Sequence, residues 1–91
     1  MMREKYFLPL LSPQHHETFR GLPGSDLPDT YDEWFKLHTK EKLERNQVGF
    51  DVVEIQVDPN EFVRYITPRG IAGDGLRLLH FADEKGRGNR Y

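Results

Sequence analysis

The strongest structural signal in this sequence lies in residues 30–47, which carry the start, face and end of an amphipathic helix. Thr30 and Glu33 match a capping box, in which the threonine hydroxyl accepts a hydrogen bond from the Glu33 backbone N–H and the glutamate reaches back. Asn46 and Gly49 suit the end of such a helix. Four ring side chains at helical spacing predict its buried face: Tyr31, Trp34, Phe35 and His38.

Two short segments predict strands. Residues 5–11 are mostly apolar, and Pro9 cannot donate a ladder hydrogen bond, so we expect this strand at a sheet edge or at a bulge. Residues 50–57 alternate between apolar and polar, which is typical of a half-buried strand with Val53, Ile55 and Val57 on its inner face. Because two strands make only a marginal sheet, a third strand from this chain or from another copy is a hypothesis.

The remaining helix signals come after the second strand. Asp58 as a cap and Pro59 at the first helical position predict a helix that Pro68 and Gly70 end. Residues 74–85 allow a helix or an alternating strand. We favour the helix because Asp74 suits its start and Gly86 its end.

Residues 12–29 predict a long loop, since they contain three prolines and two glycines. Structureless loops of this length are often functional, so this is the first candidate for a binding surface. The candidate interaction residues combine this loop with the basic C-terminal segment: His15, His16, Phe19, Arg20, Leu22, Arg87 and Arg90.

Together these elements predict a single small α+β domain over residues 1–91. We expect a sheet of two or three strands with helices packed on one face, in the order β-loop-α-β-α-α. Residues 86–91 are expected to form a flexible tail.

Composition excludes several classes of site and partner. The 91-residue chain has no cysteine, which rules out disulfides and thiolate metal sites. Its formal net charge is −2 and evenly spread, unlike the basic face that duplex DNA requires. No stretch approaches the roughly 20 apolar residues that span a bilayer, so we expect no membrane partner and, by default, a cytoplasmic location.

Histidines are the main candidates for metal or acid–base chemistry, since the acidic residues Asp26, Asp29, Asp32 and Glu33 lack the spacing of a calcium-binding loop. His15, His16 and Glu17 are adjacent, but adjacent side chains point in different directions and a zinc site needs three or four converging ligands. His38 lies on the expected buried face without an identifiable nucleophile beside it. We therefore predict no catalytic residue, metal or cofactor, and keep a metal-dependent hydrolase using His15, His16 or His38 as an alternative.

The favoured hypothesis is a non-catalytic protein-interaction or accessory module, whose partner is another protein or a second copy. The long loop and a strand edge both offer binding surface, the edge by strand addition. The alternative is a weak RNA or single-stranded nucleic-acid binder that uses residues 85–91 with Arg64, Arg69 and Arg77. An open hollow ringed by ionisable groups would argue against the non-catalytic hypothesis.

Overall fold

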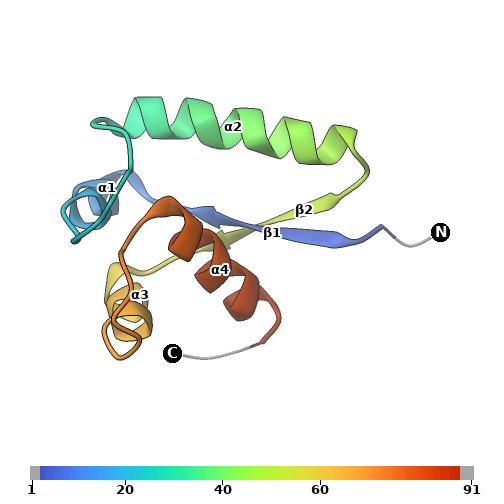
Figure 1. The fold of residues 1–91 in the computed structure, drawn as a ribbon. Helices are drawn as coiled ribbons and strands as arrows, with labels where there is room; N and C mark the ends of the chain where they lie inside the picture. The colour runs from blue at the N-terminus through green and yellow to red at the C-terminus, as the bar shows by residue number, and fades with distance from the viewer. Residues whose placement is uncertain (1–2, 89–91) are drawn as a thin grey trace.

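A computed structural model of the protein describes residues 3–88 and confirms the α+β fold class (Figure 1). In chain order the elements are β1 (Lys5–Leu10), α1 (Pro13–Arg20), α2 (Tyr31–Gln47), β2 (Asp51–Gln56), α3 (Pro59–Ile66) and α4 (Gly75–Gly86). None of the helices in these residues combines the length and apolarity that crossing a membrane demands.

The sheet consists of β1 and β2, which run parallel. Their register pairs Lys5 with Asp51 at one end and Leu10 with Gln56 at the other. Parallel neighbours cannot be joined by a tight hairpin, because the chain must first return to the starting end of the sheet. Here α1 and α2 make that return. Within residues 3–88 no third strand joins the sheet, so both of its outer edges lack a neighbouring strand.

Helices lie on both sides of this sheet (Figure 1). The Tyr6 hydroxyl donates to Glu41 of α2, whereas the ring of the next residue, Phe7, lies against Gly86 of α4. Successive strand residues point to opposite faces, so α2 and α4 cover different faces of the sheet. We expected helices on one face of the sheet only. The structure has α4 on one face and α2, which connects the two strands, on the other.

Gly86 sets how closely α4 approaches β1. A Cβ atom at this position would overlap the ring of Phe7. Glycine therefore ends the helix, as predicted, and also leaves room for Phe7 between α4 and the sheet.

The predicted helix starts are confirmed. Thr30 Oγ1 accepts from the Glu33 N–H at 3.2 Å at the start of α2. Asp58 accepts from two backbone N–H groups at the start of α3. Asp74 accepts from the Arg77 N–H at 2.9 Å at the start of α4, so the ambiguous segment is a helix and not a strand.

The prediction of an unstructured loop over residues 12–29 is wrong in its first half, where α1 forms. Pro13 is at the first helical position, where its missing N–H and fixed φ cost nothing. The run from Pro13 to Gly21 then contains no other proline or glycine. We interpreted Pro13 as a helix breaker, although it starts the helix. The element order is therefore β-α-α-β-α-α.

Phe62 of α3 lies at the centre of the hydrophobic core. Its ring centroid lies 5.8 Å from that of Phe19 in α1 and 5.6 Å from that of Phe81 in α4, and all three rings are fully enclosed. Further aliphatic and aromatic side chains complete the core, including Leu11, Trp34, Val57, Tyr65, Ile66 and Leu78.

We predict that Phe62→Ala lowers the free energy of unfolding by about 3–5 kcal/mol, because it removes a ring that joins three helices. The neighbouring Val63 is 37% exposed, and we expect Val63→Ala to change stability by about 0.5 kcal/mol or less. Urea denaturation followed by circular dichroism measures both. Similar losses in the two variants would contradict this account of the core.

Candidate functional site

Backbone hydrogen bonds show which groups of β1 face outward. The Asp51 N–H donates to the Glu4 carbonyl, and the Val57 N–H donates to the Leu10 carbonyl. In a parallel strand every second residue bonds to the same neighbouring strand. Because Glu4 and Leu10 bond towards β2, the even-numbered residues of β1 are the ones that bond to β2. The N–H and C=O groups of Lys5 and Phe7, and the C=O of Pro9, consequently point away from β2. Pro9 thus lies on the outer edge, as predicted.

The outer edge of β2 differs from that of β1. By the same alternation the Gln56 carbonyl points away from β1, and it accepts from Lys85 Nζ at 3.2 Å. A side chain from α4 therefore already occupies part of the β2 edge.

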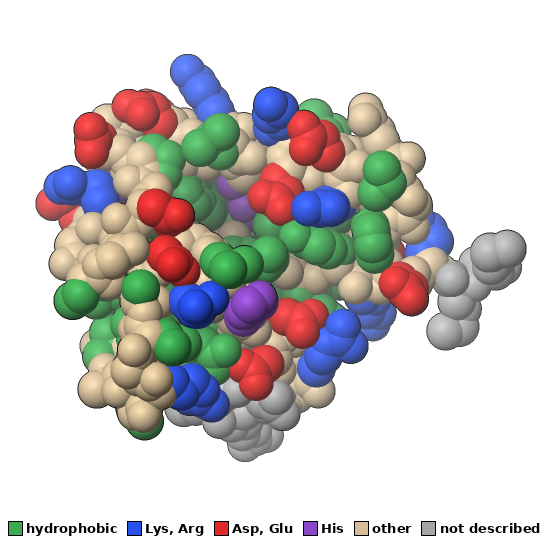
Figure 2. Space-filling view, viewed as in Figure 1, with side chains coloured by type: hydrophobic (Ala, Val, Ile, Leu, Met, Phe, Trp, Pro, Cys, Tyr) green, Lys and Arg blue, Asp and Glu red, His purple; other side chains and the backbone are tan. Residues whose placement is uncertain are grey.

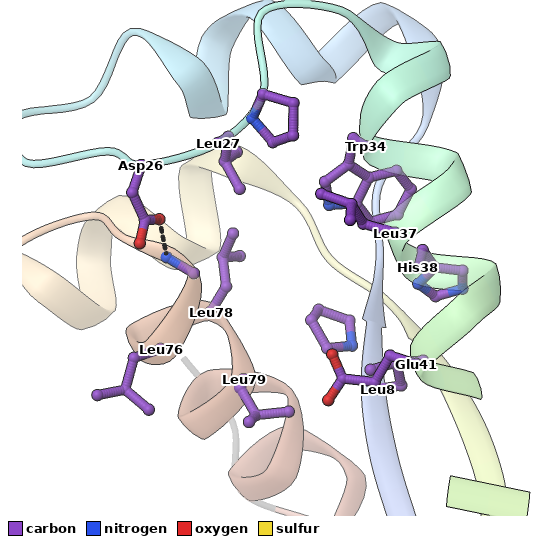
Figure 3. Close-up of a pocket in the computed structure, with 13 residues that line it drawn as sticks. Leu8, Asp26, Leu27, Trp34, Leu37, His38, Glu41, Leu76, Leu78 and Leu79 are labelled. Carbon is purple, nitrogen blue, oxygen red and sulfur yellow. Dashed lines mark hydrogen bonds between the residues drawn. The ribbon is translucent and has the colours of Figure 1, made fainter. Parts of the chain in front are cut away.

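A hollow of about 370 Å³ opens beside the end of β1 at Leu8 and Pro9 (Figure 3). Its volume is at the lower end of the roughly 300–1,000 Å³ of ligand pockets. Leucines 37 and 76, on α2 and α4, are 57% and 53% exposed at its rim. The thirteen lining residues come from β1, from α2, from α4 and from the loop between α1 and α2. They are Leu8, Pro9, Asp26, Leu27, Pro28, Trp34, Leu37, His38, Glu41, Gly75, Leu76, Leu78 and Leu79.

A second hollow, of about 270 Å³, borders the other end of β1 and is lined by residues 4–7 together with Phe50 and the side of α4. Residues of β1 line both hollows, so the two follow the same strand, and Leu79 of α4 borders both. We call the two together the β1 groove. Figure 2 shows hydrophobic side chains gathered around a hollow on this face of the molecule.

Two carboxylates and one imidazole are the ionisable groups that line the larger hollow: Asp26, Glu41 and His38. Asp26 Oδ1 accepts from the Gly75 N–H at 2.8 Å, at the start of α4. Glu41 Oε1 accepts from the Tyr6 hydroxyl at 3.0 Å and lies 3.6 Å from Arg45 Nη2. Burial raises the pKa of Tyr6, and the hydrogen bond to Glu41 adds to this rise.

His38 lies between the hollow and the sheet. Its ring stacks on Trp34 with centroids 4.8 Å apart, and its side chain is only 4% exposed. The Nε2 atom lies 3.7 Å from Glu54 Oε2, beyond hydrogen-bond distance, while Lys42 Nζ is 2.5 Å from Glu54 Oε1. Burial lowers the pKa of His38 and outweighs the opposing effect of Glu54, so the imidazole is neutral at pH 7.

The larger hollow places ionisable groups around Trp34 and His38, which is the arrangement that would argue against a non-catalytic protein. The thirteen lining residues offer two carboxylates and one imidazole, and they include no serine, threonine, cysteine, lysine or tyrosine. The lining suits contact with an apolar chain that also carries a polar or charged group.

The structure separates the candidate interaction residues of the predicted loop. His16 and Phe19 are on the inner side of α1 and are 3% and 0% exposed, so neither presents its side chain to a partner. His15 Nδ1 lies 3.0 Å from the Ser12 hydroxyl. Arg20 forms an ion pair with Glu17 at 2.9 Å, and Leu22 packs against the core.

Of the two basic candidates near the C-terminus, Arg87 borders the smaller hollow of the β1 groove. Its guanidinium bonds to Asp83 at 3.0 Å and lies 5.6 Å from the centroid of the Phe7 ring. Arg90 is outside the described residues. Residues 3–88 contain no group of three or more histidine or acidic side chains that could hold a metal ion.

Of the candidate functional residues named from the sequence, Arg87 and His38 line the groove, whereas its rim leucines were not predicted. Leu37 is off the buried face of α2, and Leu76 is in the first turn of α4 on its exposed side. An apolar residue at an exposed helix position was the available signal, but it is common in proteins and specifies no site.

Comparisons with protein-family models, with curated proteins and with solved structures each find no match for this chain. The site therefore has to be interpreted from its own residues.

We predict that His38 makes stability depend on pH below about pH 7. Because its pKa is lowered in the folded protein, the unfolded chain binds the proton more readily, and the free energy of unfolding falls as pH drops through the unfolded value of about 6.5. Urea denaturation at a series of pH values measures this. His38→Phe, which keeps a ring against Trp34, should reduce the decline; an unchanged decline would contradict the assignment to His38.

Proposed function

We propose that this protein is a non-catalytic interaction module that binds an extended segment of another protein along the β1 groove. The observation that carries the proposal is the open outer edge of β1 between two helix-lined hollows. Such an edge can take an additional strand, whose main chain supplies hydrogen bonds while its side chains enter flanking pockets.

The backbone groups of β1 support strand addition. Lys5 and Phe7 each offer an outward N–H and C=O, and Pro9 offers a C=O, so an added strand would find up to five hydrogen-bonding groups. Pro9 also supports selectivity, because its missing N–H restricts which strands pair well over the full length.

The walls of the groove supply the second part of the binding energy. Leu37, Leu76 and Leu79 border the larger hollow from α2 and α4, and the first two are more than half exposed. Covering these side chains with an apolar segment removes their surface from water at roughly 25 cal/mol per Å². An interaction partner is a physical reason for such exposed leucines to gather around one hollow.

The charges near the C-terminus give less support to the nucleic-acid alternative. Lys85 is paired with Glu61 at 2.7 Å, and Arg87 with Asp83 at 3.0 Å. Binding phosphate would compete with these pairs. We therefore do not propose a nucleic-acid partner, and a cytoplasmic location stays a prediction.

A peptide selection tests the proposal. Random nine-residue peptides displayed on phage are selected on the immobilised 91-residue chain, and a selected peptide is synthesised with a fluorophore for anisotropy titration. We expect a saturable peptide complex with one peptide per chain. Failure to obtain any saturable binder would contradict the proposal.

Two matched variants of α2 locate the binding site. We predict that Leu37→Ser weakens peptide binding about five- to thirtyfold, because it removes roughly 1–2 kcal/mol of apolar contact at the groove rim. Leu43 has the same exposure within 1% but does not line the groove, so Leu43→Ser should leave affinity unchanged. Equal effects in the two variants would contradict this site.

Sedimentation velocity on the same variants distinguishes a partner segment from a second copy. We expect a monomer at concentrations that saturate with peptide. A dimer that Leu37→Ser dissociates, together with no peptide binding, would replace the proposed partner with a second copy of this chain.

A further inference from the structure

The larger hollow of the β1 groove is acidic and apolar. Its thirteen lining residues include two carboxylates, Asp26 and Glu41, and no lysine or arginine. Because His38 is neutral at pH 7, no group that lines the hollow offsets these charges. Figure 3 shows Asp26 on the loop, with its carboxylate at the Gly75 N–H, and Glu41 on α2 at the other side of the hollow.

Each carboxylate is only partly compensated by its neighbours. The contacts of Glu41 with Tyr6 and Arg45 both involve Oε1. Asp26 receives one backbone hydrogen bond, from the Gly75 N–H to its Oδ1. A bound segment that covers the hollow with apolar groups alone would remove water from both carboxylates. The hydrogen bonds from that water would not be replaced, so binding would cost desolvation free energy.

The smaller hollow has a different charge balance. Glu4 and Asp83 line it together with Lys5 and Arg87, and Arg87 is already paired with Asp83. Acidic charge without a lining cation is therefore confined to the end of the groove at Leu8 and Pro9.

We infer that the partner of the β1 groove is an extended peptide segment with a lysine or arginine at the Leu8–Pro9 end, flanked by apolar residues. This inference depends on the proposed function. Side chains of an added strand alternate between the α2 face and the α4 face. The cation therefore points towards Glu41 on the α2 side, while the residues before and after it point towards Leu76 and Leu79 on α4.

A double-mutant cycle tests the chemistry of this segment. The starting peptide is the selected one, and its basic residue is replaced by norleucine, which keeps an aliphatic chain and removes the charge. On the unmodified protein we expect this replacement to weaken binding about three- to tenfold. On Glu41→Gln the replacement should have less than half of that effect, because the partner carboxylate is gone.

The variants are chosen to retain the fold. Glu41→Gln keeps an oxygen that accepts from the Tyr6 hydroxyl, and Asp26→Asn keeps an oxygen that accepts from the Gly75 N–H. Glu17→Gln is the matched control, because Glu17 is a surface acid on α1 outside the lining residues and its loss changes net charge equally. We expect Glu41→Gln and Asp26→Asn to weaken binding of the basic peptide, and Glu17→Gln to leave it unchanged.

Failure of this inference differs from failure of the proposed function. If peptides bind at the groove but carry no basic enrichment, or if Glu17→Gln and Glu41→Gln weaken binding equally, the inference is overturned and strand addition stands. If no peptide binds to the groove, both are overturned.

Discussion

β1 and β2 run parallel, so the chain between them has to travel back along the sheet before the second strand can begin. In this protein α1 and α2 make that return, and α2 comes to lie across one face of the two strands (Figure 1). After β2, α4 packs on the other face, and α3 packs against α4 and α1. A two-stranded sheet is marginal by itself, and here the helices on both faces stabilise it.

The same arrangement creates the β1 groove. The Tyr6 hydroxyl holds β1 to Glu41 of α2, and Phe7 packs closely against Gly86 of α4. These contacts fix β1 between two helices while its outer edge lacks a neighbouring strand in the described residues. An unprotected edge invites indiscriminate pairing, which charged side chains and proline counteract. Lys5 and Pro9 on this edge counteract such pairing, and under the proposed function they and the carboxylates beside the edge select the partner.

Local signals were sufficient to predict most of the helices and strands. Thr30, Asp58 and Asp74 each cap the helix that the sequence assigned to them, because a cap depends on residues within one turn. Pro13 was misinterpreted because proline favours a helix start as well as a helix break, and only the following residues distinguish the two.

The groove could not be predicted in the same way. Leu37 and Leu76 are 39 positions apart in sequence, and only the parallel pairing and the packing of α2 and α4 bring them to one hollow. His16 and Phe19 were predicted to be exposed because their segment was assigned to a loop. The segment is a helix whose inner side faces the core, so both side chains are buried.

Amide hydrogen exchange along β1, measured by NMR with and without a selected peptide, tests the central claim most directly. The account predicts that the outward N–H groups of Lys5 and Phe7 exchange faster than those of Tyr6 and Leu8, which donate to β2, and that peptide binding slows the outward pair at least about tenfold. Equal protection of Phe7 and Leu8 in the free protein, or outward amides that bound peptide leaves unchanged, would contradict strand addition at β1.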